Sequence, residues 1–200
     1  MPRRPRAYLA PDDAPAKQKI LIEALRLFVR DGLCETSIRD IAGATGYTNP
    51  ALFKHFKGKD ALARHLFEQC YLDLFQASQR ALAAHEEYAA RQQALIATYL
   101  ERLDADRDAV LYVQDNLRHF WPMMPGHVRR LSIVGLVHRL LELGRDEGAV
   151  TDAVPLDYLV VGWLGALQQF ARVWFFGGFP GPAARHAARL EQVIAKMTAA

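Results

Sequence analysis

The side chains best suited to chemistry lie between Ile38 and Phe56, and many of them are basic or carry an amide. Such groups can hydrogen-bond the base edges and phosphates of DNA. The set expected to face outward is Arg39, Tyr47, Asn49, Pro50, Ala51, Lys54 and His55. A small basic face on a stiff helix suits the major groove. This stretch therefore predicts a DNA-reading element.

Two short helices hinged at a glycine would position this face. The first helix has apolar residues at helical spacing: Ile38, Ile41 and Ala42. Gly46 can adopt the positive φ of a turn, and Thr48 can cap the next helix. The inner face of that second helix is expected to be Leu52, Phe53 and Phe56. The order of these elements predicts a helix-turn-helix.

Composition and charge agree with a DNA-binding head on a larger body. The chain has 200 residues, 51% of them hydrophobic, which is enough to bury a core. Residues 1–60 hold eleven Lys and Arg against seven Asp and Glu, a net charge of +4, whereas residues 61–200 carry −1. A basic N-terminal quarter is typical of a domain that binds a polyanion.

The first fifteen residues, with four prolines and three arginines, predict a flexible basic arm. Arg3, Arg4 and Arg6 could enter a minor groove, or the arm could be a solvated tail. The arm has no apolar segment of signal-peptide length, so we expect a cytoplasmic protein. Cys34 and Cys70 lack paired spacing and are expected to be reduced thiols.

The rest of the chain predicts an all-α fold, because no strand-like alternation or glycine-rich phosphate loop occurs. Outside the helix-turn-helix, helices are expected at about 17–30, 59–84, 86–103, 106–120, 127–146, 155–176 and 182–198. The predicted domains are an arm (1–15), a three-helix head (16–62) and a helical-bundle body for effector binding and dimerisation (63–200).

The residues from Ile20 to Leu62 resemble the DNA-binding domain of the TetR (tetracycline repressor) family. The resemblance rests on the segments ALRLF, DGL, TSIRDIAGATG, TNPALFKHF and GKDAL, in the family's order and spacing. A lone helix-turn-helix pattern has many false positives, but this combination has few. Beyond Leu62 the resemblance implies only an all-helical ligand-binding and dimerisation domain.

The resemblance implies a role for individual residues of the head. Arg39 would bond guanine and Asn49 would bond adenine, with Pro50 and Ala51 entering the groove beside them. Contacts to phosphate are expected from Thr48, Lys54, His55 and Lys59. The complete predicted DNA-binding set is Ser37, Arg39, Tyr47, Thr48, Asn49, Pro50, Ala51, Phe53, Lys54, His55 and Lys59. The family usually has tyrosine at the position of Phe53, so one phosphate contact is in question.

A dimer is predicted from the last two helices. Leu156, Val160, Trp163, Leu167, Phe170 and Trp174 step by four and three, as in a coiled-coil seam. The uncharged run between Asp157 and Arg172 is fourteen residues, short of the ~20 that a membrane span needs. The predicted homodimer interface is Val160, Trp163, Leu167, Phe170, Trp174, Leu190, Ile194 and Met197. A symmetric dimer would read palindromic DNA.

A small-molecule effector is predicted from the large side chains of the body. The candidates are Tyr71, Phe75, Tyr99, Tyr112, Phe120, Trp121, Met124 and His138. An aromatic cavity with a few polar groups is the usual form of such a pocket, although most of these residues could also be ordinary core. The histidines lack metal-ligand spacing, and we expect neither a metal nor a cofactor.

These observations predict a dimeric, ligand-responsive transcriptional regulator, a repressor released from palindromic operator DNA by an apolar or amphipathic effector. No catalytic motif occurs, so an enzyme is not expected. The alternative is a dimeric helical DNA-binding protein with a filled core and no effector. A third reading is a small-molecule carrier with a vestigial head.

Overall fold

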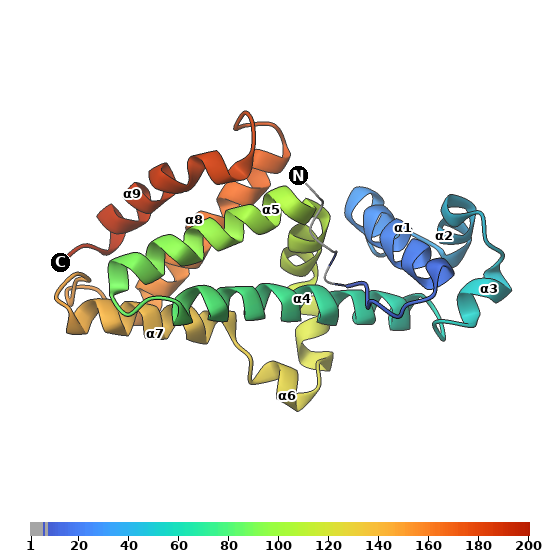
Figure 1. The fold of residues 1–200 in the computed structure, drawn as a ribbon, viewed down its shortest axis with the longest axis horizontal. Coiled ribbons are helices and arrows are strands. Elements are labelled where there is room, and N and C mark those ends of the chain that lie inside the picture. The colour runs from blue at the N-terminus through green and yellow to red at the C-terminus, as the bar shows by residue number, and fades with distance from the viewer. Residues whose placement is uncertain (1–5, 7) are drawn as a thin grey trace. The chain divides into compact units, whose positions relative to one another are not determined.

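The computed structural model describes residue 6 and residues 8–200, and it confirms an all-α protein (Figure 1). In this part of the chain the α-helices are α1 (Pro15–Asp31), α2 (Ile38–Thr45), α3 (Asn49–Phe53), α4 (Lys59–Ala83), α5 (Tyr88–Phe120), α6 (Gly126–Arg129), α7 (Ile133–Asp146), α8 (Leu156–Phe175) and α9 (Ala187–Thr198). Two 3₁₀ segments occur at η1 (Trp121–Met123) and η2 (Ala183–His186). Arg3 and Arg4 of the predicted basic arm lie outside the described residues.

Two parts of the helix prediction differ from the structure. The expected break between residues 103 and 106 is a local kink within α5, where Asp106 has φ −155° and ψ 82°. The single helix predicted at 127–146 is wrong, because α6 ends at Arg129 and α7 begins after Ser132. The Ser132 hydroxyl accepts a hydrogen bond from the Gly135 amide at 3.1 Å, so a new N-cap starts there.

The chain divides into two compact units that each take part of α4 and part of α5. The first unit runs to Asp73 and adds Asp108–Val128, and the second comprises Leu74–Arg107 and Arg129–Ala200. The unit that holds the helix-turn-helix is therefore larger than the predicted head of residues 16–62. The reason is the packing of the end of α5, which the sequence placed in the body.

The core of the first unit joins the helix-turn-helix to α4 and α5. α1 buries one face, formed by Ile20, Leu21, Ala24, Leu25, Leu27 and Phe28. The Phe28 ring stacks on Tyr112 of α5 with 5.8 Å between ring centroids, and the Tyr112 hydroxyl donates to the Ala63 carbonyl at 3.0 Å. Burial raises the pKa of the Tyr112 hydroxyl, which keeps it protonated as a donor. These contacts fix α1 relative to α4 and α5.

The second unit is built on α8, which packs against α7 and α9. The Trp163 indole donates to the Gln92 side-chain oxygen at 3.3 Å, and the Tyr88 hydroxyl donates to the same oxygen at 2.6 Å. Gly144 is required by close packing, since a Cβ there would lie 2.5 Å from Val150. Among the described residues, none of the helices is both long enough and apolar enough to cross a membrane.

Candidate nucleic-acid interface

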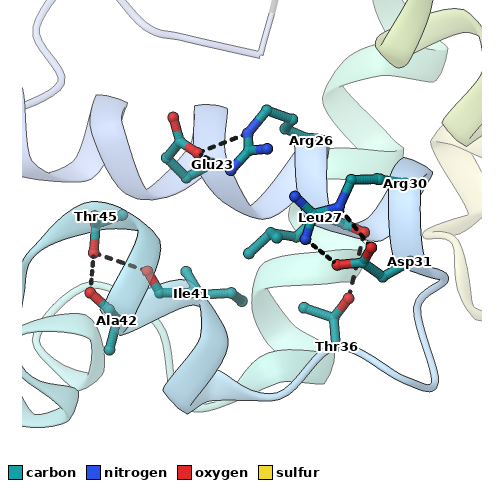
Figure 2. Close-up of polar contacts among 9 residues, drawn as sticks. All are labelled: Glu23, Arg26, Leu27, Arg30, Asp31, Thr36, Ile41, Ala42 and Thr45. Carbon is teal, nitrogen blue, oxygen red and sulfur yellow. Dashed lines mark hydrogen bonds and ion pairs between the residues drawn. The ribbon is translucent and has the colours of Figure 1, made fainter.

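The loop between α1 and α2 is held by hydrogen bonds to its main chain. α1 ends at Gly32, which has φ +94°, a conformation that favours glycine. The buried Thr36 hydroxyl donates to the Gly32 carbonyl at 2.9 Å, and Figure 2 shows its second, longer contact to the Leu27 carbonyl. These two hydrogen bonds hold the loop against the end of α1 before α2 begins.

A capping box starts α2. The Ser37 hydroxyl accepts from the Asp40 amide at 3.2 Å, and the Ser37 amide donates to the Asp40 carboxylate at 2.7 Å. Hydrogen bonds from the Ser37 hydroxyl and amide lower the pKa of the Asp40 carboxyl. Ser37 is predicted to contact DNA and is exposed. Its hydroxyl and amide are, however, already hydrogen-bonded to Asp40 at the start of α2.

The turn between α2 and α3 has the predicted glycine. The Thr45 hydroxyl donates to the carbonyls of Ile41 and Ala42 at 2.9 and 3.1 Å (Figure 2). Gly46 then adopts φ +72°, the left-handed conformation expected at a helix C-terminus. The turn directs the chain into α3.

α3 is short and its inner face is smaller than predicted. Thr48 occupies the N-cap position, but its side chain makes no capping hydrogen bond. Leu52 is buried, whereas Phe53 is 52% exposed, so the prediction that Phe53 belongs to the inner face is wrong. The helix ends at Phe53 after five residues, and Phe56 lies beyond the following turn, with its ring 5.5 Å from His65.

Most of the predicted DNA-binding side chains are accessible. Those that are exposed are Ser37, Arg39, Thr48, Pro50, Phe53 and Lys54. Those that are half-buried are Tyr47, Asn49, Ala51, His55 and Lys59. The Lys19 ammonium lies 5.6 Å from the centre of the Tyr47 ring, a cation–π contact that holds Tyr47 against α1. The exposed set comes from α2, the turn and α3, as a helix-turn-helix surface requires.

Lys59 also stabilises the fold by hydrogen bonds to the α1–α2 loop, which the sequence did not predict. Its ammonium donates to the carbonyls of Leu33 at 2.9 Å and Cys34 at 3.3 Å. An ammonium has three donors, so one N–H remains for a phosphate. Lys59 therefore ties the first residue of α4 to the α1–α2 loop.

The same segment matches a family model described as "Bacterial regulatory proteins, tetR family", over residues 20–66. The chain is also 32% identical, over 112 residues, to the HTH-type transcriptional repressor KstR2 of Rhodococcus jostii (strain RHA1). This segment is therefore similar to the DNA-binding domain of the TetR family. The alignment with the Rhodococcus repressor covers 54% of this chain and only 55% of that protein. The matched family is described as one of regulatory proteins.

Solved structures extend the similarity in fold to nearly the whole chain. The ketosteroid transcriptional regulator KstR2 of Mycobacterium tuberculosis has a TM-score of 0.84 at 19% identity, covering 98% of this chain and all of that one. FadR of Bacillus subtilis, solved in complex with stearoyl-CoA, has a TM-score of 0.70 at 12% identity, covering 90% of this chain and 97% of that one. At these identities the likeness shows a shared fold and nothing further.

The side chains predicted to bind an effector are divided between the two units. Tyr71, Tyr112, Phe120, Trp121 and Met124 belong to the first unit, and Phe75, Tyr99 and His138 to the second. All except Trp121 and His138 are buried. In the first unit they pack on one another, with the Tyr71 and Trp121 ring centroids 4.9 Å apart. His138 instead lies 3.4 Å from the Glu142 carboxylate.

The side chains predicted to form a dimer interface mostly face the core of their own protomer. Val160, Trp163, Leu167, Phe170 and Ile194 are buried within the protomer, and their place in a dimer interface stays a prediction. Trp174 and Leu190 are half-buried, and Met197 is 38% exposed. Within the second unit α8 packs against α7 and α9, and its Trp163 bonds Gln92 of α5.

A different apolar face of α8 and α9 is accessible, and the sequence interpretation missed it. Tyr158 and Val161 of α8 are 72% and 70% exposed, and Val193 of α9 is 58% exposed. Met197 packs on Gly162, where an added Cβ would lie 2.7 Å from its sulfur. The available signal was that α8 is apolar nearly all round, so one face had to remain uncovered.

Proposed function

We propose that this protein is a dimeric transcriptional repressor of the TetR type that binds twofold-symmetric operator DNA and is released by a small apolar or amphipathic effector. Because its partner is DNA, it would act in the cytoplasm. The observation that carries the proposal is the exposed surface of α2 and α3, within the segment that matches the family model.

The exposed surface provides two kinds of contact. Arg39 on α2 and Asn49 at the start of α3 have the side chains that bond guanine and adenine in the major groove. Lys54 is exposed and can pair with phosphate, and Lys59 has a donor left for the same purpose. Base contacts would specify the sequence, and phosphate contacts would fix the register.

The proposed dimer interface is the exposed apolar face of α8 and α9, centred on Tyr158, Val161 and Val193. Large apolar side chains that remain exposed on packed helices are typical of an association surface. Two helices from each copy would make a four-helix interface around a twofold axis. A dimer is required because one α3 of five residues reads few base pairs.

The effector is proposed from the relatives. FadR of Bacillus subtilis was solved with stearoyl-CoA, and the Mycobacterium relative is named for ketosteroids. Both names support an effector with a large apolar part. An effector that prefers one conformation of the body would weaken DNA binding, and DNA would weaken effector binding by the same factor.

One observation favours the alternative, a dimeric DNA-binding protein with a filled core. Most of the side chains predicted to line an effector cavity are buried, and several lie against one another. Aromatic side chains in such contacts fill the space that a ligand would need. The alternative keeps the DNA surface and the dimer and removes only the effector.

Two measurements test the proposal. Sedimentation at micromolar concentration should give a dimer, and Val161→Arg should give a monomer that is still folded. Stearoyl-CoA and a sterol-derived acid should then be titrated into the dimer bound to its best DNA site. Release of DNA together with a higher melting temperature supports the effector, whereas DNA binding that is unaffected by either compound class supports the alternative.

A further inference from the structure

An open cavity of about 450 Å³ lies in the first unit, between the α1–α2 loop and α5. Its apolar part is formed by Phe28, Val29, Leu33 and Tyr112. The volume falls within the range of small-molecule sites, and a mostly apolar lining with a few polar groups is their usual form. Of the eight side chains predicted to bind an effector, Tyr112 is the one that lines this cavity.

The polar groups of the cavity carry negative charge. Glu35, from the loop, and Asp115, from α5, line it and are both exposed. Asn116 and His119 add further hydrogen-bonding groups. Lys59 bonds the carbonyls of Leu33 and Cys34 but does not line the cavity. Within the described residues no three His, Cys, Asp or Glu side chains are placed to hold a metal ion, so the carboxylates are not part of such a site.

We propose that this cavity is a binding site for a small organic cation with an aromatic or aliphatic body. The apolar walls would bury the body of the molecule, and the carboxylates of Glu35 and Asp115 would attract its charged end. The same charges disfavour fatty acids, acyl-CoA and other anions at this site. The site is therefore distinct in ligand chemistry from the acyl-CoA type of effector considered above.

The position of the cavity gives the bound cation a direct contact with the loop that precedes the helix-turn-helix. Leu33 and Cys34 form one wall, and their carbonyls are the acceptors of the Lys59 ammonium. Gly32, also in the wall, accepts the Thr36 hydroxyl that precedes α2. A ligand in the cavity would therefore contact the loop that sets the start of α2.

The test uses the full chain without DNA, so its outcome does not depend on the proposed repressor function. Three probes share one ring system and differ in charge: 2-naphthylmethylammonium, 2-naphthalenemethanol and 2-naphthoate. Binding is measured by calorimetry at pH 8, well above the ordinary pKa of imidazole. We expect the ammonium to bind about tenfold more tightly than the alcohol and the carboxylate to bind least.

Site-specific variants and a chemical probe locate the binding. Glu35→Gln and Asp115→Asn together should reduce the affinity of the ammonium to that of the alcohol, and Glu86→Gln, an exposed carboxylate of the second unit, should change nothing. Val29→Phe, which fills the cavity, should lower the binding affinity of all three probes. The exposed Cys34 thiol should be alkylated by iodoacetamide several-fold more slowly with the ammonium bound, whereas Cys70 is buried and provides the control.

The Cys34 measurement keeps the proposal testable if Val29→Phe does not fold. The proposal is overturned if the carboxylate probe binds as tightly as the ammonium. It is equally overturned if no probe protects Cys34, or if the ammonium binds the double variant as well as the natural chain.

Discussion

The ammonium of Lys59 donates a hydrogen bond to the carbonyl of Leu33 at 2.9 Å, across 26 positions of the chain. Lys59 is the first residue of α4, and Leu33 lies in the loop that leads from α1 to α2. The bond closes the three-helix arrangement, because both ends of the α2–α3 segment are then tied to each other. Lys59 is predicted to contact DNA, and it also stabilises the arrangement of the helices that are predicted to contact DNA.

Replacing Lys59 by methionine should lower the free energy of unfolding by about 1.5–3 kcal/mol, because hydrogen bonds of a charged donor are lost. Urea denaturation measures this change. Lys57→Met is the matched control, since Lys57 is exposed, is two residues away and has the same charge. If Lys59 also contacts phosphate, its variant should reduce the slope of log K against log salt by about one unit. Equal stability of the two variants would contradict the role of Lys59 as a tie.

Phe53→Tyr should raise DNA affinity without changing the preferred site. The ring is 52% exposed, so a hydroxyl costs no buried polar group, and it can donate to a phosphate. The expected gain is about 0.5–1.5 kcal/mol, measured by fluorescence anisotropy on specific and unrelated DNA. Phe53→Leu is the control that lacks the hydroxyl. A gain confined to one DNA sequence would show that residue 53 reads bases instead.

Folding stability should fall as the pH drops below about 6.5, in part through His65. Burial, and next the nearby Lys17 ammonium, lower the pKa of His65 below its ordinary value of 6.5. The unfolded chain then takes up a proton that the folded chain resists, so this contribution is complete above pH 6.5 and is lost as the pH falls through the folded pKa. His65→Phe, which keeps a ring beside Phe56, should flatten the dependence, as measured by chemical denaturation at each pH.

The control for this effect is His127→Gln, because His127 is exposed. It should leave the pH dependence of stability unchanged. An unchanged profile in His65→Phe would mean that other groups cause the loss in acid.

Two neighbouring side chains of α8 should respond differently to mutation. Val161 is 70% exposed, so Val161→Arg should abolish the dimer while leaving the stability of the separated protomer within about 0.5 kcal/mol. Trp163 is 1% exposed and hydrogen-bonded to Gln92, so Trp163→Ala should lower stability by about 3–5 kcal/mol. Sedimentation and urea denaturation separate the two effects. A stable monomer from Trp163→Ala would restore the heptad stripe as the interface.

The helices and the reading surface were predictable because their signals are local. Gly46 marked its turn by its type, and Ser37 preceded an acidic residue three positions later. The division of the chain into units was not decided by local pattern. The end of α5 joins the first unit through Tyr112 and Phe120, whose partners are far away in sequence.

The neighbours of each face of α8 could not be predicted from the local pattern for a similar reason. A heptad stripe shows that a helix packs against other helices, but not whether these belong to the same chain. Here Trp163 and Leu167 are buried within the protomer, where the Trp163 indole bonds Gln92 of α5, whereas Tyr158 is exposed. Likewise, the type and position of Lys59 indicated a phosphate contact and gave no sign of the Leu33 carbonyl.

The most direct test of the central claim is selection of binding sites from random double-stranded DNA with the full chain, repeated with Arg39→Ala and Asn49→Ala. The account predicts a twofold-symmetric site, and each variant should lose about 1–3 kcal/mol of discrimination at one position of each half-site. Lys54→Ala should instead lower the affinity for all DNA sequences about equally. An asymmetric selected site, or unchanged base preferences in both variants, would contradict the proposal that α2 and α3 of a dimer read operator DNA.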